Sequence, residues 1–284
     1  MSVRVRYPRY AGSFYNGGRD RLRSQLEWCF LHRFGPGSLP ETSETPLKRV
    51  VALISPHAGY IYSGPVAAHA YHFLASDGKP DVAVLLGPNH TGLGSAISIY
   101  KDGLWRTPLG DLSVDSDLAG EIVRESGIID VDDSAHNYEH SIEVQLPFLQ
   151  YVYSSPPRIV PIAFLMQDLE SSLNVGEAVG KALLNRNAVV IASTDLTHYE
   201  PQSSANEKDK AVIEAITSLD EKLLYEIVEE RSVSMCGYGP TISAIAAAKA
   251  LGAKSGKLLC YKTSGDVTGD FSAVVGYASI ALLK

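Results

Sequence analysis

The fold is decided by a stretch that reads Val50-Val51-Ala52-Leu53-Ile54-Ser55-Pro56-His57-Ala58-Gly59-Tyr60. Its continuous apolar run is typical of a strand with both faces covered, as in a parallel sheet. The run ends at a turn that contains proline and glycine and carries a histidine. The stretch therefore predicts a buried parallel strand that places a polar side chain at its carboxyl end.

The same alternation of apolar runs and amphipathic stretches continues along the chain and is typical of an α/β layer structure. The other predicted strands are Val82–Gly87, Ala96–Tyr100, Ile159–Leu165, Ala188–Ser193, Leu258–Thr263 and Ala273–Leu283. The predicted helices are Asp20–His32, Gly64–Ala75, Ser116–Ser126, His140–Tyr153, Leu169–Leu184, Gln202–Thr217, Leu219–Glu229 and Pro240–Leu251. We therefore expect an α/β fold with a central, largely parallel β-sheet flanked by helices.

The chain has 284 residues, 45% of them apolar, and can bury a large core without disulfide or metal staples. Its three cysteines, Cys29, Cys236 and Cys260, lie far apart, which fits a reducing compartment. The one extended loop-like stretch, residues 34–48, lies near the N-terminus. We expect a single domain over residues 1–284.

The net charge is −7, so composition provides no broad cationic field for nucleic-acid phosphates or anionic lipid. No apolar run reaches the roughly 18 residues needed to cross a bilayer. The first residues lead into polar sequence rather than the apolar core of a signal peptide. These features predict a cytoplasmic protein without a nucleic-acid or membrane partner.

Histidine and aspartate residues follow three of the predicted strands directly. His57 follows the first strand, His90 follows Val82–Gly87, and Asp195 and His198 follow Ala188–Ser193. Open α/β sheets bind ligands outside the carboxyl ends of their strands. The pattern therefore predicts one site that these side chains share.

His57 and His90 each lie in a turn that contains proline, which can fix the direction of the imidazole. Imidazole binds iron, zinc, copper and nickel, and two histidines with one anionic ligand leave positions open for water or substrate. Cys236 is the candidate for the anionic ligand, because it directly precedes a predicted helix whose dipole favours a thiolate. The alternative is that each histidine only binds loop backbone.

Asp195 and His198 lie three residues apart in a turn, where both can face one pocket. A carboxylate that orients and an imidazole that moves a proton are an acid–base pair. Asp195 could instead cap a helix, and His198 could be an ordinary surface histidine.

A second group, His136, His140 and Glu143, has helical spacing but is not an H-E-x-x-H zinc motif. We expect His140 and Glu143 to contact the metal ligands rather than the metal itself, or to be buried polar partners. The sequence contains no P-loop, no G-x-G-x-x-G and no G-x-S-x-G elbow.

Six ordered motifs closely resemble the Memo family over nearly the whole chain. They are Tyr7-Pro8-Arg9-Tyr10-Ala11-Gly12-Ser13-Phe14-Tyr15, Pro56-His57-Ala58-Gly59-Tyr60, Gly87-Pro88-Asn89-His90, the run from Glu139 to Phe148, Ser193-Thr194-Asp195-Leu196-Thr197-His198 and Cys236-Gly237. The resemblance implies a fold similar to class III extradiol dioxygenases, which have a non-haem iron site.

By this resemblance, His57, His90 and Cys236 line the metal pocket, and His198, next to Asp195, looks like the active-site base. The dioxygenases complete their two-histidine site with a carboxylate, whereas this family offers a cysteine. Microbial relatives are linked with radical-SAM proteins, which implies such a protein as a partner.

Two classes of function follow. The first is a metal-dependent oxidoreductase that holds iron(II), with zinc or copper as other candidates, and acts on a small organic substrate. The alternative is a binding protein that uses the same pocket to hold a metal or a peptide without turnover.

Overall fold

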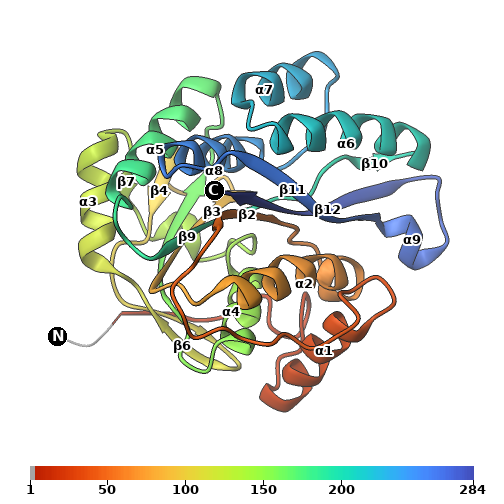
Figure 1. Cartoon of the computed structure of the whole chain (residues 1–284), viewed down its shortest axis with the longest axis horizontal. Helices are drawn as coiled ribbons and strands as arrows, with labels where there is room; N and C mark the ends of the chain where they lie inside the picture. Colours follow the sequence, from red (N-terminus) through yellow and green to blue (C-terminus); the bar gives the residue numbers. More distant parts are fainter. Residues whose placement is uncertain (1–3) are drawn as a thin grey trace.

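The computed structural model describes residues 4–284 and is built on a large mixed sheet with helices on both faces (Figure 1). Four neighbouring parallel strands form its centre. In spatial order they are β2 (Val50–Ser55), β9 (Ala188–Ser193), β3 (Val82–Pro88) and β8 (Arg158–Phe164). The expected α/β fold is confirmed, and its parallel part is this central group.

The margins of the large sheet are mostly antiparallel. On one side β12 (Val274–Leu283) runs antiparallel to β2 and also pairs with β10 (His198–Glu200) and β11 (Ser255–Thr263). On the other side β4 (Ile97–Ile99) runs antiparallel to β8 and parallel to β7 (Asp130–Val131). The prediction of a largely parallel sheet therefore holds for the central strands, and the whole sheet is mixed.

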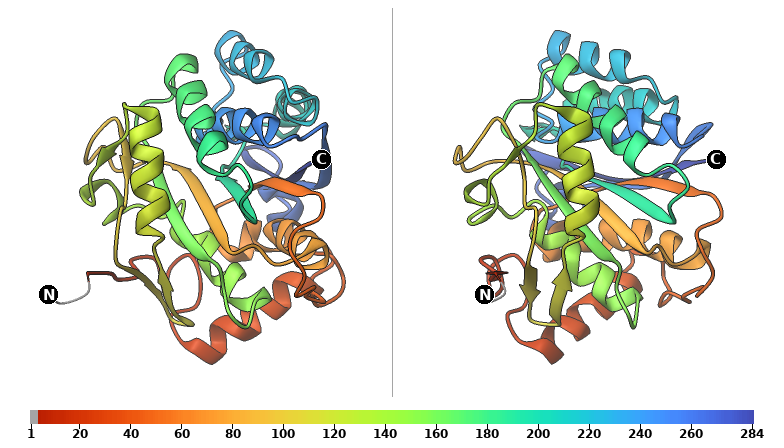
Figure 2. Two further views of the ribbon diagram at one scale, coloured as in Figure 1. Left: turned by 60° about the vertical axis from the view of Figure 1, so that its left-hand side comes forward. Right: turned by 90° about the vertical axis from the view of Figure 1, so that its left-hand side faces the viewer.

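Helices cover the two faces of the sheet in separate layers, as Figure 2 shows from two further directions. One layer contains α1 (Arg19–Leu31), α2 (Tyr60–Asp77) and α4 (Leu146–Val152). The other contains α3 (Ser116–Ser126), α5 (Leu169–Ala182), α6 (Gln202–Thr217), α7 (Glu221–Glu230) and α8 (Tyr238–Ala250). Side chains of β3 alternate between the two cores, as strand geometry requires.

Several short elements were not predicted from the sequence. A separate three-stranded sheet contains β1 (Val5–Arg6), β5 (Leu104–Thr107) and β6 (Gly110–Ser113), and α9 (Ser264–Thr268) precedes β12. These segments are too short or too polar to produce a clear hydrophobic period. Tertiary pairing stabilises them instead.

The predicted helix His140–Tyr153 is wrong over its first residues. The chain there forms a turn and the 3₁₀ helix η2 (Glu143–Gln145), and α4 begins only at Leu146. Backbone N–H groups of His140 and Ser141 donate to the Glu139 carboxylate at 2.8 Å each, which holds them in a turn. The change matters because it turns His140 away from a regular helix face.

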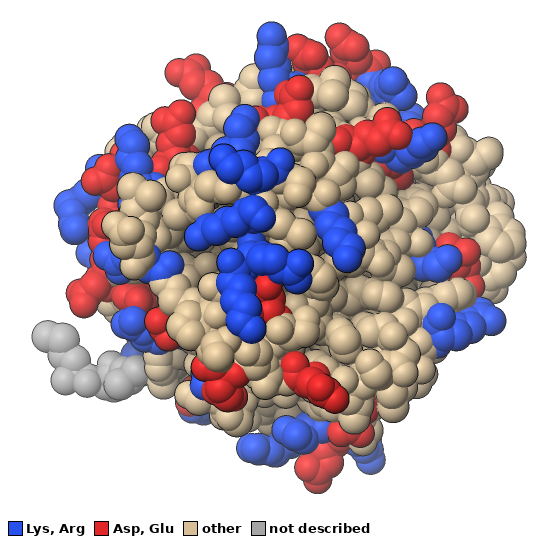
Figure 3. Space-filling model, viewed as in Figure 1, with Lys and Arg blue, Asp and Glu red and all other residues tan. Residues whose placement is uncertain are grey.

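The net negative charge is not spread evenly over the surface. Figure 3 shows Lys and Arg side chains gathered in a band near the place where Figure 1 marks the C-terminus, with Asp and Glu mostly around it. Composition did not predict this local band. Among residues 4–284, no helix is both long and apolar enough to cross a membrane.

Candidate metal centre

The carboxyl ends of three adjacent parallel strands bring the predicted site residues together. Strands β2 and β3 flank β9, with Ser55 opposite Ser193 and Leu86 opposite Ala192. The chain leaves these strands at the same edge of the sheet, so the turns that carry His57, Asp195 and His90 are neighbours.

His57, His90 and Cys236 form one compact group. The Nε2 atom of His57 lies 3.2 Å from the Sγ atom of Cys236. One ligand atom from each of the three residues lies within 4.8 Å of the others. A group of two imidazoles and one thiol at this spacing can surround a single metal ion.

Cys236 reaches the group because a glycine follows it. A β-carbon on Gly237 would lie 2.7 Å from the carbonyl oxygen of Ser193, so only glycine lets the start of α8 approach the end of β9. The backbone N–H of Asp195 donates to the sulfur at 3.2 Å. The cysteine is thus held against the strand that carries Asp195.

Hydrogen bonds fix the tautomer of His57. Ser193 Oγ donates its only proton to the Ser141 carbonyl at 2.6 Å and accepts a hydrogen bond from Gln145. The Nδ1 atom of His57, 3.0 Å from this Oγ, must therefore carry the proton. The lone pair of His57 Nε2 then faces Cys236.

The carboxylate of Glu139 fixes the tautomer of His90. This carboxylate lies 3.0 Å from His90 Nδ1 and accepts a backbone N–H of the same histidine. This arrangement, in which a carboxylate binds the far nitrogen of a ligand imidazole, is common in metal sites. The sequence analysis did not predict Glu139 as a site residue. It grouped His136, His140 and Glu143 by their helical spacing and did not include Glu139.

His136, His140 and Glu143, which the helical spacing grouped together, lie in different places in the structure. His140 enters the site, with its ring centroid 4.6 Å from that of His90 and 5.2 Å from that of His57. Glu143 is buried elsewhere in an ion pair with Arg6. His136 is buried beside Tyr100 and Trp105 and does not line the site.

Burial favours the neutral form of two of the site histidines, His57 and His140, and a metal-ligating imidazole must be neutral at the ligating nitrogen. Burial lowers the pKa of His57 well below its ordinary value, with further lowering by His140 and His90. Burial also lowers the pKa of His140 to about 4, against the opposing charge of Glu139.

The cysteine differs from the sequence expectation of a favoured thiolate. Burial, together with the charge of Asp195, raises the pKa of the Cys236 thiol. The helix dipole therefore does not by itself ionise the thiol, and a bound cation would be needed to do so.

Asp195 and His198 line the same cavity as the histidines. Asp195 accepts the backbone N–H of His57 at 2.8 Å, and burial raises the pKa of its carboxyl to about 6. His198 Nδ1 lies 2.8 Å from the Ser234 carbonyl, which can only accept, so the lone pair is on Nε2. The chain continues into β10, so Asp195 does not cap a helix.

The cavity has a volume of about 710 Å³. Its walls combine polar groups from the sheet edge with aromatic side chains, namely Phe14, Tyr62, Tyr199 and Tyr277. Pockets with this mixture are typical of sites for small organic ligands.

Comparison with known proteins identifies the family. The model of the family described as Memo-like protein matches residues 6–281. The chain belongs to the Memo family. A MEMO1 family protein of Methanopyrus kandleri is 56% identical over 281 residues, which cover 98% of this chain and 99% of that protein. A second Memo relative, from Methanocaldococcus jannaschii, is 51% identical and covers 97% of this chain and 98% of its own.

A solved structure shares the Memo fold at low sequence identity. The crystal structure of uncharacterized protein JW3007 from Escherichia coli K12 matches with a TM-score of 0.59 and 14% identity, over 82% of this chain and 99% of that one. At this identity, the likeness concerns the fold alone.

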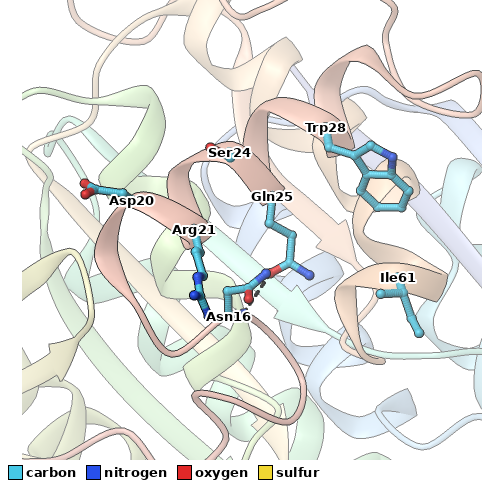
Figure 4. Close-up of a pocket in the computed structure, with 7 residues that line it drawn as sticks. All are labelled: Asn16, Asp20, Arg21, Ser24, Gln25, Trp28 and Ile61. Carbon is cyan, nitrogen blue, oxygen red and sulfur yellow. Dashed lines mark hydrogen bonds between the residues drawn. The ribbon is translucent and has the colours of Figure 1, made fainter.

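The Memo chain has a second surface cavity that lacks the chemistry of the first. Figure 4 shows this cavity of about 520 Å³ beside α1, where Asn16, Gln25, Trp28 and Ile61 point toward it. No histidine or cysteine lines it. The other two cysteines, Cys29 and Cys260, do not belong to the group formed by His57, His90 and Cys236.

Proposed function

We propose that this protein is a metal-dependent oxidoreductase that binds iron(II) through His57, His90 and Cys236 and acts on a small organic substrate. The observation that supports it best is the convergence of these three ligand atoms within 4.8 Å beside a large cavity.

The donor set fits a metal ion of this kind. Both imidazoles have their Nδ1 atoms engaged by Ser193 and Glu139, which leaves two Nε2 lone pairs available. Two imidazoles and one thiolate suit iron, zinc and copper, and they leave coordination positions open. Bound iron(II) would supply one-electron chemistry and Lewis acidity at these open positions.

The chain itself supplies acid–base chemistry. His198 is half-buried at the cavity wall, its Nδ1–H is held by Ser234, and its Nε2 can take a proton from a substrate hydroxyl. A positioned base of this kind typically contributes about 10²- to 10⁴-fold to a rate. Asp195 holds the backbone of His57 and faces the same cavity.

The test is metal stoichiometry after anaerobic loading with iron(II). Cys236→Ser should lose most of the bound metal, because a neutral hydroxyl replaces a soft anionic ligand. Cys260→Ser is the matched control, since this cysteine lies outside the ligand group and should leave the stoichiometry unchanged.

His198→Ala should keep its metal and lose turnover. Oxygen uptake with catechols and with a metabolite extract would reveal that turnover. Loss of metal from His198→Ala with retention by Cys236→Ser would contradict the roles assigned here.

A second candidate function is binding of an elongated ligand, such as a peptide, without turnover. The main cavity shares Phe14, Gly59 and Tyr62 with a smaller cavity of about 170 Å³. That cavity in turn shares Asn16, Gln25 and Ile61 with the one shown in Figure 4. Tight ligand binding without oxygen uptake by the metal-loaded protein would favour this candidate.

A further inference from the structure

Tyr199 has a backbone conformation that its residue type rarely adopts. Among residues 4–284, four non-glycine residues have positive φ, namely Asn185, Tyr199, Leu219 and Ser232. Leu219 and Ser232 directly follow the C-caps of α6 and α7, and Asn185 lies two residues after that of α5. Left-handed residues are common at helix ends, but Tyr199 does not follow a helix.

Tyr199 lies instead at an irregularity between two strands. In the β10–β12 pair, His198 is opposite Val275 and Glu200 is opposite Val274, so the register shifts across Tyr199. An extra residue in one strand leaves the ladder and can aim its side chain in a new direction. With φ of 58°, a bulky tyrosine at this place is conformationally strained.

The neighbours of Tyr199 hold it in this conformation. On one side, the backbone N–H of His198 donates to Ser234 Oγ at 2.7 Å, and the His198 ring is held by the Ser234 carbonyl. On the other side, Glu200 accepts hydrogen bonds from Lys208 at 2.7 Å and from Ser204 at 2.5 Å. Strain that the surroundings impose in this way is characteristic of functional sites.

The side chain gains little from packing in return. Tyr199 is 78% exposed, yet it lines the main cavity, and its ring centroid lies 5.9 Å from that of His198. The ring is therefore placed at the cavity mouth with an open face. Burial of the ring does not compensate the strained backbone, and the exposed ring is available to contact a ligand in the cavity.

We propose that Tyr199 is a specificity-determining residue that packs its ring against a planar aromatic ligand bound in the cavity. The inference rests on the proposed metal centre, which would hold the polar end of that ligand. Tyr62 and Tyr277 line the same cavity and provide further aromatic surface. Contacts between aromatic rings prefer stacked or edge-to-face geometry, which selects for flat ligands.

The experiment compares two metal-chelating probes with the same polar head, benzohydroxamate and acetohydroxamate. Binding of each to protein loaded anaerobically with iron(II) is measured by calorimetry. The wild-type protein should prefer benzohydroxamate, and Tyr199→Ala should reduce that preference by about 2- to 10-fold. Affinity for acetohydroxamate should not change, because it has no ring.

Two variants serve as controls. Tyr199→Phe keeps the ring and should keep the preference, and Tyr7→Ala removes an aromatic side chain that is 56% exposed and does not line the cavity. An unchanged preference in Tyr199→Ala would overturn the role of Tyr199. Failure of both probes to bind wild-type protein would instead overturn the metal centre and, with it, this inference.

The strained backbone has its own test in metal-free protein. Asn and Gly tolerate the left-handed region, whereas Ala does not. Melting temperatures of Tyr199→Asn and Tyr199→Gly should therefore exceed that of Tyr199→Ala by about 2 °C. If Tyr199→Ala is at least as stable as both, the strained conformation is wrong and the ring has no fixed place at the mouth.

Discussion

Two buried carboxylates, Asp77 and Glu139, hold backbone at opposite ends of the sheet. Asp77 accepts the N–H groups of Lys48, Arg49 and Val50 at 2.9 to 3.0 Å, just where β2 begins. Glu139 accepts three backbone N–H groups. One belongs to His90, just beyond the end of β3, and the other two belong to His140 and Ser141. Burial raises the pKa of both carboxyls, but other contacts outweigh it. Hydrogen bonds lower the pKa of Asp77, and hydrogen bonds together with the charges of His90 and His140 lower that of Glu139 to about 2.

The difference between them lies in the side chains that they hold. Asp77 contacts the guanidinium of Arg49, which is 62% exposed. Glu139 instead contacts the rings of His90 and His140, which line the main cavity. The same carboxylate clamp therefore serves the fold at one end of the sheet, and at the other it also orients candidate metal ligands.

Asp77→Ala should give the largest effect. It leaves three backbone donors without their acceptor, and the free energy of unfolding should fall by about 3 to 5 kcal/mol. Urea unfolding measures this change, with the exposed Asp81→Ala as control. The metal stoichiometry of the protein that remains folded should not change. A loss of metal binding would contradict the idea that Asp77 serves only the fold, whereas Glu139 also serves the metal site.

Glu139→Gln should weaken metal binding by about 10- to 100-fold, because the amide orients and polarises the His90 ring less well than the carboxylate does. Competition against a chelator of known affinity measures the change. The exposed Glu44→Gln is the control. If unfolding is strongly affected while metal affinity stays the same, Glu139 is only a structural clamp like Asp77.

The stability contributed by the Asp77 charge should depend on pH in a defined direction. Backbone hydrogen bonds hold the folded pKa of Asp77 below 3.8, its ordinary value, despite burial. The charge therefore stabilises the fold fully above about pH 4 and loses this effect as the pH falls through the folded pKa. The difference in unfolding free energy between wild type and Asp77→Asn should shrink below pH 4, and growth of that difference in acid would contradict the clamp.

Arg49→Met should give the smallest effect. The Nε atom of Arg49 lies 3.4 Å from Asp77 Oδ1, and the arginine side chain is largely exposed. Exposed ion pairs contribute little, so the loss should be about 0.5 kcal/mol in urea unfolding. A loss as large as that from Asp77→Ala would show that the ion pair, and not the backbone hydrogen bonds, is the important contact.

The strongly apolar segments were the most predictable part of the fold. Val50–Ser55 and Ala188–Ser193 match β2 and β9 residue for residue, because continuous apolar runs in a parallel sheet have few alternatives. The segment from His136 to Gln145 was the least predictable. Its turn depends on the Glu139 carboxylate and on Ser141, whose hydroxyl donates to the Pro88 carbonyl at 2.8 Å.

The candidate site was predictable only in part for the same reason. The turns after β2, β9 and β3 identified His57, Asp195, His198 and His90 as residues of one sheet edge. No pattern in the sequence indicates how the loop that carries Glu139 and His140 packs against the sheet, so their contacts with His90 could not be derived. A β-carbon on Gly87 would lie 2.5 Å from Ser141 Oγ, so the close approach of that loop to β3 also depends on this glycine, and the motif around Gly87 does not indicate which segment packs against it.

The sequence by itself determined the α/β class, the central strands, the family and the residues at the strand ends, because these depend on local patterns of apolar and polar residues. Only the tertiary structure decided that Cys236 lies 3.2 Å from His57 across 179 residues, that Glu139 fixes His90, and that Tyr199 is strained at the cavity mouth. Each of these depends on contacts between segments far apart in the chain. Local propensity carries no information about such contacts, because they form only when the sheet and its helices pack together.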